Sequence, residues 1–174
     1  MSVNREVDGK KPVEHLKDWI TDFAGFDNPV VVSHTSELFS VKEDRRSRLD
    51  ICRKNILEVV AFCEQSGTRL ALETIWNFTE QTGEKSSLGE TEEEFLEIVN
   101  FSDSECLGMH IDTGHSHLLG NLMRIVELAG DRLFSFHIHD NHGQREGGHW
   151  DEHLIPGEGD IDWERLLSTL ASVN

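Results

Sequence analysis

Residues 134–163 read FSFHIHDNHGQREGGHWDEHLIPGEGDIDW, a stretch that gathers histidine, aspartate and glycine in one short span. It begins inside a predicted strand, Leu133–His139, in which apolar and β-favouring residues precede a polar tip. Side chains two residues apart on a strand lie on the same face. His137 and His139 are therefore expected side by side at the end of this strand.

Asp151 and His153 have the same spacing of two residues, and they reach that strand end if their loop folds back over it. Neutral imidazole and carboxylate groups are ligands that suit zinc, manganese and similar divalent ions. These residues are therefore candidate metal ligands. His142 and His149 fall on no predicted element, so we expect them to be solvated surface groups.

Three earlier segments predict buried strands with a polar residue at or near the end: Val30–Val32 before His34, Arg69–Ile75 around Glu73, and Leu107–Ile111 before Asp112. A carboxylate within a buried strand costs several kcal/mol unless it is paired or bound to a cation. Glu73 therefore indicates a positively charged partner or a bound ion.

Helical segments separate and flank these strands, because apolar residues recur at helical spacing over residues 12–25, 41–66, 91–99, 116–129 and 162–170. Thr91 and Glu94 predict a capping box, and Asp160 or Asp162 is expected to cap the last helix. Residues 79–89 are expected to form a polar loop. One strand and one helix in about 30 to 40 residues predict right-handed parallel β/α units.

In parallel β/α folds the active site lies at the carboxyl ends of the strands. His34, Glu73, Asp112 and His137 follow one another at intervals of 39, 39 and 25 residues, one strand apart each time. The fold is therefore expected to bring these four side chains to one rim. Carboxylate and imidazole groups at successive strand ends predict a divalent metal site there.

The composition restricts the class of partner. The chain has 174 residues, with 16 Lys and Arg against 33 Asp and Glu, so its formal net charge is −17. This charge disfavours nucleic acids and anionic membranes, whose phosphates are bound through basic residues.

The length predicts one domain, residues 1–174, with residues 1–11 flexible. Three widely spaced cysteines and the lack of a run of about 18 apolar residues indicate a soluble cytoplasmic protein.

Four motifs resemble those of the xylose isomerase-like TIM barrels, a family of sugar and sugar-phosphate isomerases and epimerases that also includes the DNA-repair enzyme endonuclease IV. The motifs are LETIWN at 72–77, MHIDTGHSHLLG at 109–120, FHIHDN at 136–141 and DEHLIPGEGDIDW at 151–163. The similarity extends over roughly residues 30–170. It implies an α/β fold of the (β/α)8 barrel type and a small sugar-like substrate.

The two branches of the family imply different roles for the same positions. In the isomerases and epimerases, the residues that match Glu73, Asp112 and His137 bind one divalent ion, and the match to His115 contacts the substrate. In the endonuclease branch, the matches to His34, Glu73, Asp112 and His137 join a zinc cluster, and the matches to His115, Asp151 and His153 hold a third zinc. We expect Glu73 and His115 to be catalytic and His115 and His139 to bind the substrate.

The length sets a further expectation. A full barrel of this kind needs about 250 residues, whereas this sequence predicts four strands and five helices. By comparison with the family, the first strands and the last strand, which carries a second glutamate, are missing. We therefore expect an incomplete barrel, either a fragment of a longer protein or a chain that completes its sheet as a homo-oligomer.

Three functions are consistent with these residues and motifs. The first is an isomerase or epimerase of a sugar-like substrate that depends on Mn, Zn, Co or Mg, with carboxylates moving the proton. The second is a zinc-dependent phosphoesterase like endonuclease IV, which the net charge of −17 opposes. The third is a sugar- or metal-binding barrel fragment without catalysis.

Overall fold

The computed structural model describes residues 2–3, 11–145, 148–149 and 151–173. One parallel sheet contains, in this order, β1 (Val30–His34), β3 (Arg69–Glu73), β5 (Leu107–Asp112) and β6 (Leu133–His137). The helices that precede, connect and follow these strands are α1 (Pro12–Phe23), α2 (Arg45–Ser66), α4 (Glu92–Val99), α5 (Thr113–Leu118), α6 (Leu122–Ala129) and α7 (Trp163–Val173). The prediction of four parallel strands linked by helices is confirmed.

The alternation of side chains along the central strands separates the core from the site. Leu70 and Leu72 of β3, and Met109 and Ile111 of β5, belong to one buried apolar cluster with residues of α2, α4 and α6. The residues between them face the opposite side of the sheet. The register places His34 beside Glu73 and Asp112 beside His137, so the polar strand ends are aligned.

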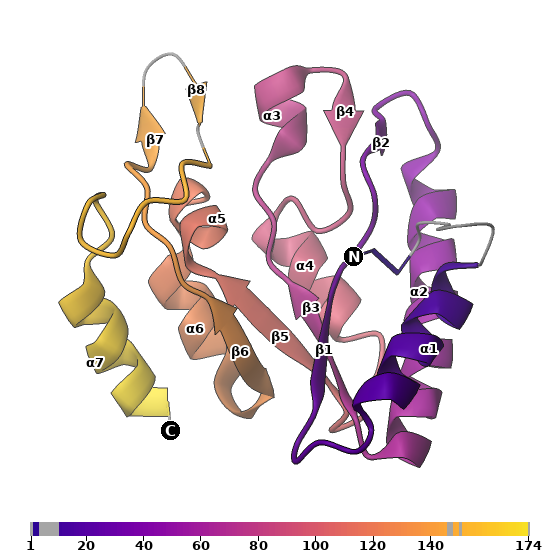
Figure 1. The fold of residues 1–174 in the computed structure, drawn as a ribbon. Coiled ribbons are helices and arrows are strands. Elements are labelled where there is room, and N and C mark those ends of the chain that lie inside the picture. The colour runs from indigo at the N-terminus through magenta and orange to yellow at the C-terminus, as the bar shows by residue number, and fades with distance from the viewer. Residues whose placement is uncertain (1, 4–10, 146–147, 150, 174) are drawn as a thin grey trace.

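The helices cover one face of this sheet, and Figure 1 shows α4 and α6 behind the strands with α1 and α2 at the β1 side. Asp44 caps the start of helix α2, because its side chain accepts a hydrogen bond from the Arg46 N–H, and Gly67, with φ 70°, caps its end. Its buried stripe consists of Cys52, Ile56, Val59, Val60 and Cys63. None of the described helices is both long and apolar enough to cross a membrane.

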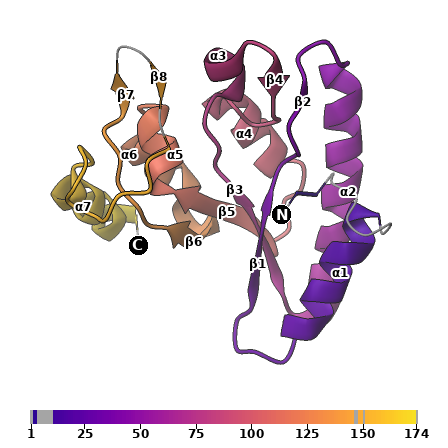
Figure 2. The same ribbon diagram turned by 45° about the horizontal axis from the view of Figure 1, so that its top comes forward.

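Strands β1 and β6 form the two edges of the sheet, as Figures 1 and 2 show. Beyond β1, an isolated parallel bridge joins Ser2 to His34. No described strand pairs with the free side of β6 in this sheet, and the β6 residues remain partly exposed. The described part is therefore an open four-stranded sheet of the kind expected for half a barrel.

Several predicted boundaries need correction. Strand β3 ends at Glu73, two residues before the predicted end at Ile75, and β6 ends at His137, two residues before His139. The predicted helix 116–129 is two helices, because the chain turns between them at Gly120, which has φ 68°. The helix expected from residue 41 begins at Arg45, after residues that pair in a short strand.

The predicted polar loop 79–89 also contains short elements. They are α3 (Phe78–Thr82) and β4 (Lys85–Ser86), and β4 pairs with β2 (Phe39–Ser40) in an antiparallel ribbon. A second ribbon follows β6 and consists of β7 (Gln144–Arg145) and β8 (Gly148–His149). Both ribbons rise from the carboxyl end of the parallel sheet, at the top of Figure 1.

Candidate metal and substrate site

Two carboxylates at the carboxyl ends of adjacent strands form the centre of the site. Glu73 ends β3 and is 4% exposed, and Asp112 ends β5 and is 1% exposed. The Oε2 atom of Glu73 lies 3.0 Å from His34 Nε2, and its Oε1 atom lies 3.0 Å from His137 Nδ1. His137 Nδ1 is also 3.5 Å from Asp112 Oδ2. The four residues predicted to meet at one rim do meet there.

His115 reaches the same centre from the first turn of α5. Asp112 caps this helix, since its Oδ1 accepts a hydrogen bond of 2.8 Å from the His115 N–H. The His115 ring then turns back over the sheet, with Nδ1 2.9 Å from the carbonyl oxygen of Thr74 and 4.0 Å from Glu73 Oε1. A carbonyl oxygen can only accept, so Nδ1 carries a proton and Nε2 faces Asp151 Oδ2 at 3.3 Å.

The loop after β6 folds back over the strand ends, which is the condition under which Asp151 and His153 were expected to reach them. Asp151 Oδ2 lies 2.9 Å from His153 Nε2, and Asp151 Oδ1 lies 3.7 Å from His139 Nε2. The rings of His139 and His153 are stacked, with centroids 4.0 Å apart and planes 4° from parallel. Within the described residues, Asp151 Oδ1 is buried without a hydrogen-bond partner. A second group of metal-type ligands therefore lies beside the first.

His139 joins the two groups. It is 6% exposed, and its Nε2 lies 2.7 Å from Asp112 Oδ1. Its backbone is fixed by Thr113, whose Oγ1 donates to the His139 carbonyl oxygen at 2.6 Å and accepts from the His139 N–H at 3.0 Å. A Cβ atom at Gly114 would overlap the His139 ring, so this close approach of α5 to the ring requires glycine.

Asp140 anchors the loop that carries Asp151 and His153. Its side chain is fully buried, and its Oδ2 accepts hydrogen bonds of 2.8 Å from the Gly157 N–H and from Trp163 Nε1. The backbone of Asp140 forms an antiparallel bridge with that of Leu154. The motif that follows the histidines in sequence therefore folds against Asp140 and closes one side of the site.

The charges of the cluster are strongly coupled. Burial raises the pKa of Glu73, but the hydrogen bond from His34 and the charges of His34, His137 and His115 lower it by more, to about 2. Burial lowers the pKa of His115, whereas its hydrogen bond to Asp151 and the nearby carboxylates raise it to about 9. Glu73 is therefore ionised at neutral pH and needs positive charge beside it.

The donor set fits a divalent cation. Three groups of side chains place one ligand atom each within 4.8 Å of the others: His115, His139, Asp151 and His153; Glu73, His110 and His137; and Glu73, Asp112 and His115. Nitrogen and carboxylate donors at this spacing suit zinc, cobalt or manganese. A cation would also compensate the two buried carboxylates, which the surrounding imidazoles compensate only when they are protonated.

One histidine of this set has no counterpart in the prediction. His110 lies within β5, two residues before Asp112, and is 2% exposed. The available signal was its spacing, because a residue two before Asp112 shares its face of the strand. His142, expected to be a solvated surface group, is partly buried, and its Nδ1 lies 2.9 Å from Glu152 Oε2. The side chain of His149 lies outside the described residues.

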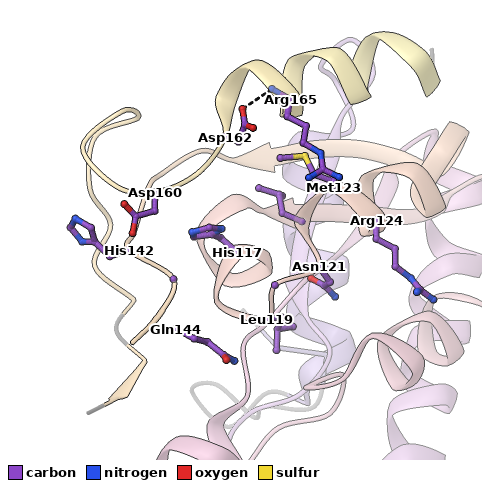
Figure 3. A pocket seen from close by; sticks show the side chains of 13 residues that line it. His117, Leu119, Asn121, Met123, Arg124, His142, Gln144, Asp160, Asp162 and Arg165 are labelled. Carbon is purple, nitrogen blue, oxygen red and sulfur yellow. Dashed lines mark hydrogen bonds between the residues drawn. The ribbon is translucent and has the colours of Figure 1, made fainter. Parts of the chain in front are cut away.

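A separate cavity of about 580 Å³ lies beside the turn from α5 to α6 and the start of α7 (Figure 3). Its lining includes polar side chains of both charges, among them His117, Asn121, Arg124, Asp160 and Arg165. No predicted site residue contributes to its described lining. The cavity and the carboxylate–imidazole cluster are therefore distinct features of the molecule.

The comparison with protein families matches the whole chain, residues 1–174, to the family described as xylose isomerase-like TIM barrel. An uncharacterized protein of Methanocaldococcus jannaschii is 34% identical over 176 residues, which cover 99% of this chain and 56% of that protein. Inosose isomerase of Bacillus subtilis is 29% identical over 147 residues, which cover 83% of this chain and 49% of that enzyme.

Solved structures agree in fold. The crystal structure of a D-tagatose 3-epimerase-like protein superposes with a TM-score of 0.79 at 33% identity, covering 93% of this chain and 58% of that one. The IolI protein, solved with a zinc atom bound, gives a TM-score of 0.78 at 22% identity and covers 99% and 61% of the two chains. The chain thus spans about half the length of the curated relatives it matches. Because the family model matches its full length and its sheet consists of parallel β/α units, the chain belongs to the xylose isomerase-like TIM barrel family.

Proposed function

We propose that this chain carries the metal-binding part of an isomerase or epimerase that acts on a small sugar-like substrate. The observation that carries the proposal is the pair of buried carboxylates, Glu73 and Asp112, surrounded by imidazoles at the carboxyl ends of adjacent parallel strands. Similarity to an inosose isomerase and to a D-tagatose 3-epimerase-like protein supports the same class of reaction.

The metal ligands in this proposal are Glu73, Asp112 and His137, with His34 beside them and Asp151 and His153 in the neighbouring group. When bound, a divalent ion would polarise the substrate carbonyl and increase the acidity of the adjacent C–H or O–H group. On the side of the long loop, the ring of His153 stacks on the buried ring of His139 beside these ligands.

Proton transfer is assigned to Glu73. A carboxylate with a pKa of about 2 is ionised at neutral pH and can accept a proton, although it is a weak base. It therefore acts on a C–H group that is already acidified. His115, with a pKa raised to about 9, is protonated in the free protein and can donate a hydrogen bond to a substrate oxygen through Nε2. His139 is assigned to substrate binding with it.

A second candidate is hydrolysis of a phosphoester by a zinc cluster. It is favoured by one observation, the adjacent group of His115, His139, Asp151 and His153, which offers ligands for a further ion. The formal net charge of −17 opposes binding of a nucleic acid backbone. The isomerase or epimerase reaction is therefore preferred.

The test combines metal content with solvent exchange. The purified chain is analysed for bound metals, loaded with manganese, cobalt or zinc, and incubated in deuterated water with ketohexoses and with an inosose. The proposal predicts about one strongly bound ion and deuterium incorporation next to the carbonyl. Metal binding with sugar affinity but no exchange would identify a binding protein, and cleavage of an abasic-site oligonucleotide would favour the phosphoesterase.

A further inference from the structure

His110 lies next to the proposed metal ligands but outside the set that the family resemblance assigns. It occupies the inner face of β5, and the sheet register pairs it with Glu73 on one side and with Ser135 on the other. Its ring packs edge-on against that of His137, with centroids 4.1 Å apart and planes at 78°. The side chain is 2% exposed, so bulk water does not solvate it.

The two ring nitrogens of His110 differ in their surroundings. Nδ1 lies 2.7 Å from Ser135 Oγ. Nε2 is buried and has no hydrogen-bond partner among the described residues. Leaving a buried polar atom unpaired costs about 1–3 kcal/mol, so this nitrogen requires an explanation. When Nδ1 donates its proton to the serine, Nε2 carries a lone pair and is ready to bind a cation.

The neighbouring donors complete the arrangement. Glu73, His110 and His137 each place a ligand atom within 4.8 Å of the other two. We propose that His110 Nε2 is a further metal ligand, and that Glu73, His110 and His137 form a nitrogen-rich site for zinc or cobalt in preference to magnesium. The preference follows from the ligands, because imidazole suits zinc and similar ions whereas magnesium takes oxygen ligands and keeps much of its water.

This inference rests on the proposed function in one respect, since the same Glu73 and His137 hold the ion in both. A purely structural role of His110 would lead to a different result. If the ring only packs against His137 and bonds Ser135, then Nε2 stays free of metal and the affinity for zinc does not depend on it.

The direct test uses the unsubstituted chain labelled with nitrogen-15 in its histidines and loaded with cadmium-113 as a substitute for zinc. The expected result is a one-bond coupling between cadmium and Nε2 of His110, together with a coupling to His137. A spectrum in which His137 couples and His110 does not would overturn the inference while leaving the proposed function intact. Failure of the chain to bind the ion would overturn both.

Substitutions measure the contribution of His110 to affinity. By titration calorimetry, His110→Leu should bind zinc about 10- to 100-fold more weakly, and Ser135→Ala, which frees the ring, should show a smaller loss. His15→Gln, on the distant helix α1, is the matched control and should bind zinc like the unsubstituted chain. Equal zinc affinity in His110→Leu, or competition by magnesium at similar concentration, would contradict the inference. If cadmium couples to His110 but no deuterium is exchanged into the substrate, the inference about His110 holds. Only the proposed isomerase or epimerase reaction is then contradicted.

Discussion

Glu73 contacts two imidazoles of the site, with His34 and His137 each 3.0 Å from one of its oxygens. Glu73→Gln keeps the shape of the side chain but removes its negative charge and its capacity to accept a proton. We expect turnover to fall by about 10² to 10⁴-fold and zinc affinity to fall as well, whereas Glu80→Gln on α3 should leave both unchanged. Steady-state kinetics and calorimetry measure the two effects, and unchanged turnover would remove Glu73 from the proposed mechanism.

Gly114 is the second residue whose identity the geometry dictates. A Cβ atom there would lie 2.6 Å from His139 Nδ1 and closer still to the next ring carbon. Gly114→Ala should therefore displace the His139 ring from Asp112 and destabilise the chain by about 1–3 kcal/mol. Urea unfolding tests the stability. Gly25→Ala meets no atom within 4 Å and serves as the control, and equal stability of the two variants would refute the predicted overlap.

The sequence predicted most of the site at the level of single residues. Glu73, Asp112 and His137 could be placed because each ends a strand whose apolar residues are easily recognised, and strand ends meet at one rim. His110 could not be placed as securely, because it lies inside an otherwise apolar strand. From the sequence, a single polar residue in such a strand can only be predicted to be buried. The strand register is needed to show that Ser135 and Glu73 lie beside it.

Among the larger elements, the segment from Asp140 to Trp163 depends on one carboxylate. Burial raises the pKa of Asp140, but the hydrogen bond from Trp163 and those from backbone N–H groups lower it by more, below its ordinary value of 3.8. Asp140→Asn places an amide N–H against these donors and should cost about 2–4 kcal/mol at neutral pH. Because the folded pKa is depressed, this stability is present above pH 4 and is lost as the pH falls further.

Thermal unfolding of Asp140→Asn and of the unsubstituted chain at pH 7 and pH 3 tests this prediction. The difference between the two proteins should be smaller at pH 3 than at pH 7. Glu158→Gln, on the exposed turn of the same loop, is the control and should match the unsubstituted chain at both values. A difference that is independent of pH would mean that the charge of Asp140 does not hold the loop.

The boundaries of elements were predictable where capping residues mark them. The last helix starts after Asp162, whose Oδ1 accepts from the Arg165 N–H at 3.0 Å, and α4 starts after Thr91. The predicted capping box is only half formed. Thr91 accepts from the Glu94 N–H, but the Glu94 carboxylate accepts from Arg45 and from the Gly89 N–H and not from the Thr91 N–H. The ribbons of two-residue strands were missed, because two residues are too few to show an alternating pattern.

At the scale of the whole molecule, the chain presents an open sheet with an acidic surface. Its four strands are half of the eight that a barrel of this family contains, and it spans 56% of one curated relative and 49% of another. The family and the parallel order of the strands followed from the motifs and from their spacing. The four described strands do not show how a barrel would close. The single domain and the homo-oligomer therefore remain predictions.

Binding of one ion should stabilise this entire unit, because the two buried carboxylates come from adjacent central strands. At a free zinc concentration about 100-fold above its dissociation constant, the gain is about 2.7 kcal/mol. For a chain of this length that gain corresponds to a rise in the unfolding midpoint of about 5–10 °C. Calorimetry with zinc, with magnesium and after chelation measures it. Zinc should raise the midpoint, the chelator should reverse the rise, and magnesium should have little effect. A midpoint that zinc leaves unchanged would show that the strand ends hold no stabilising ion.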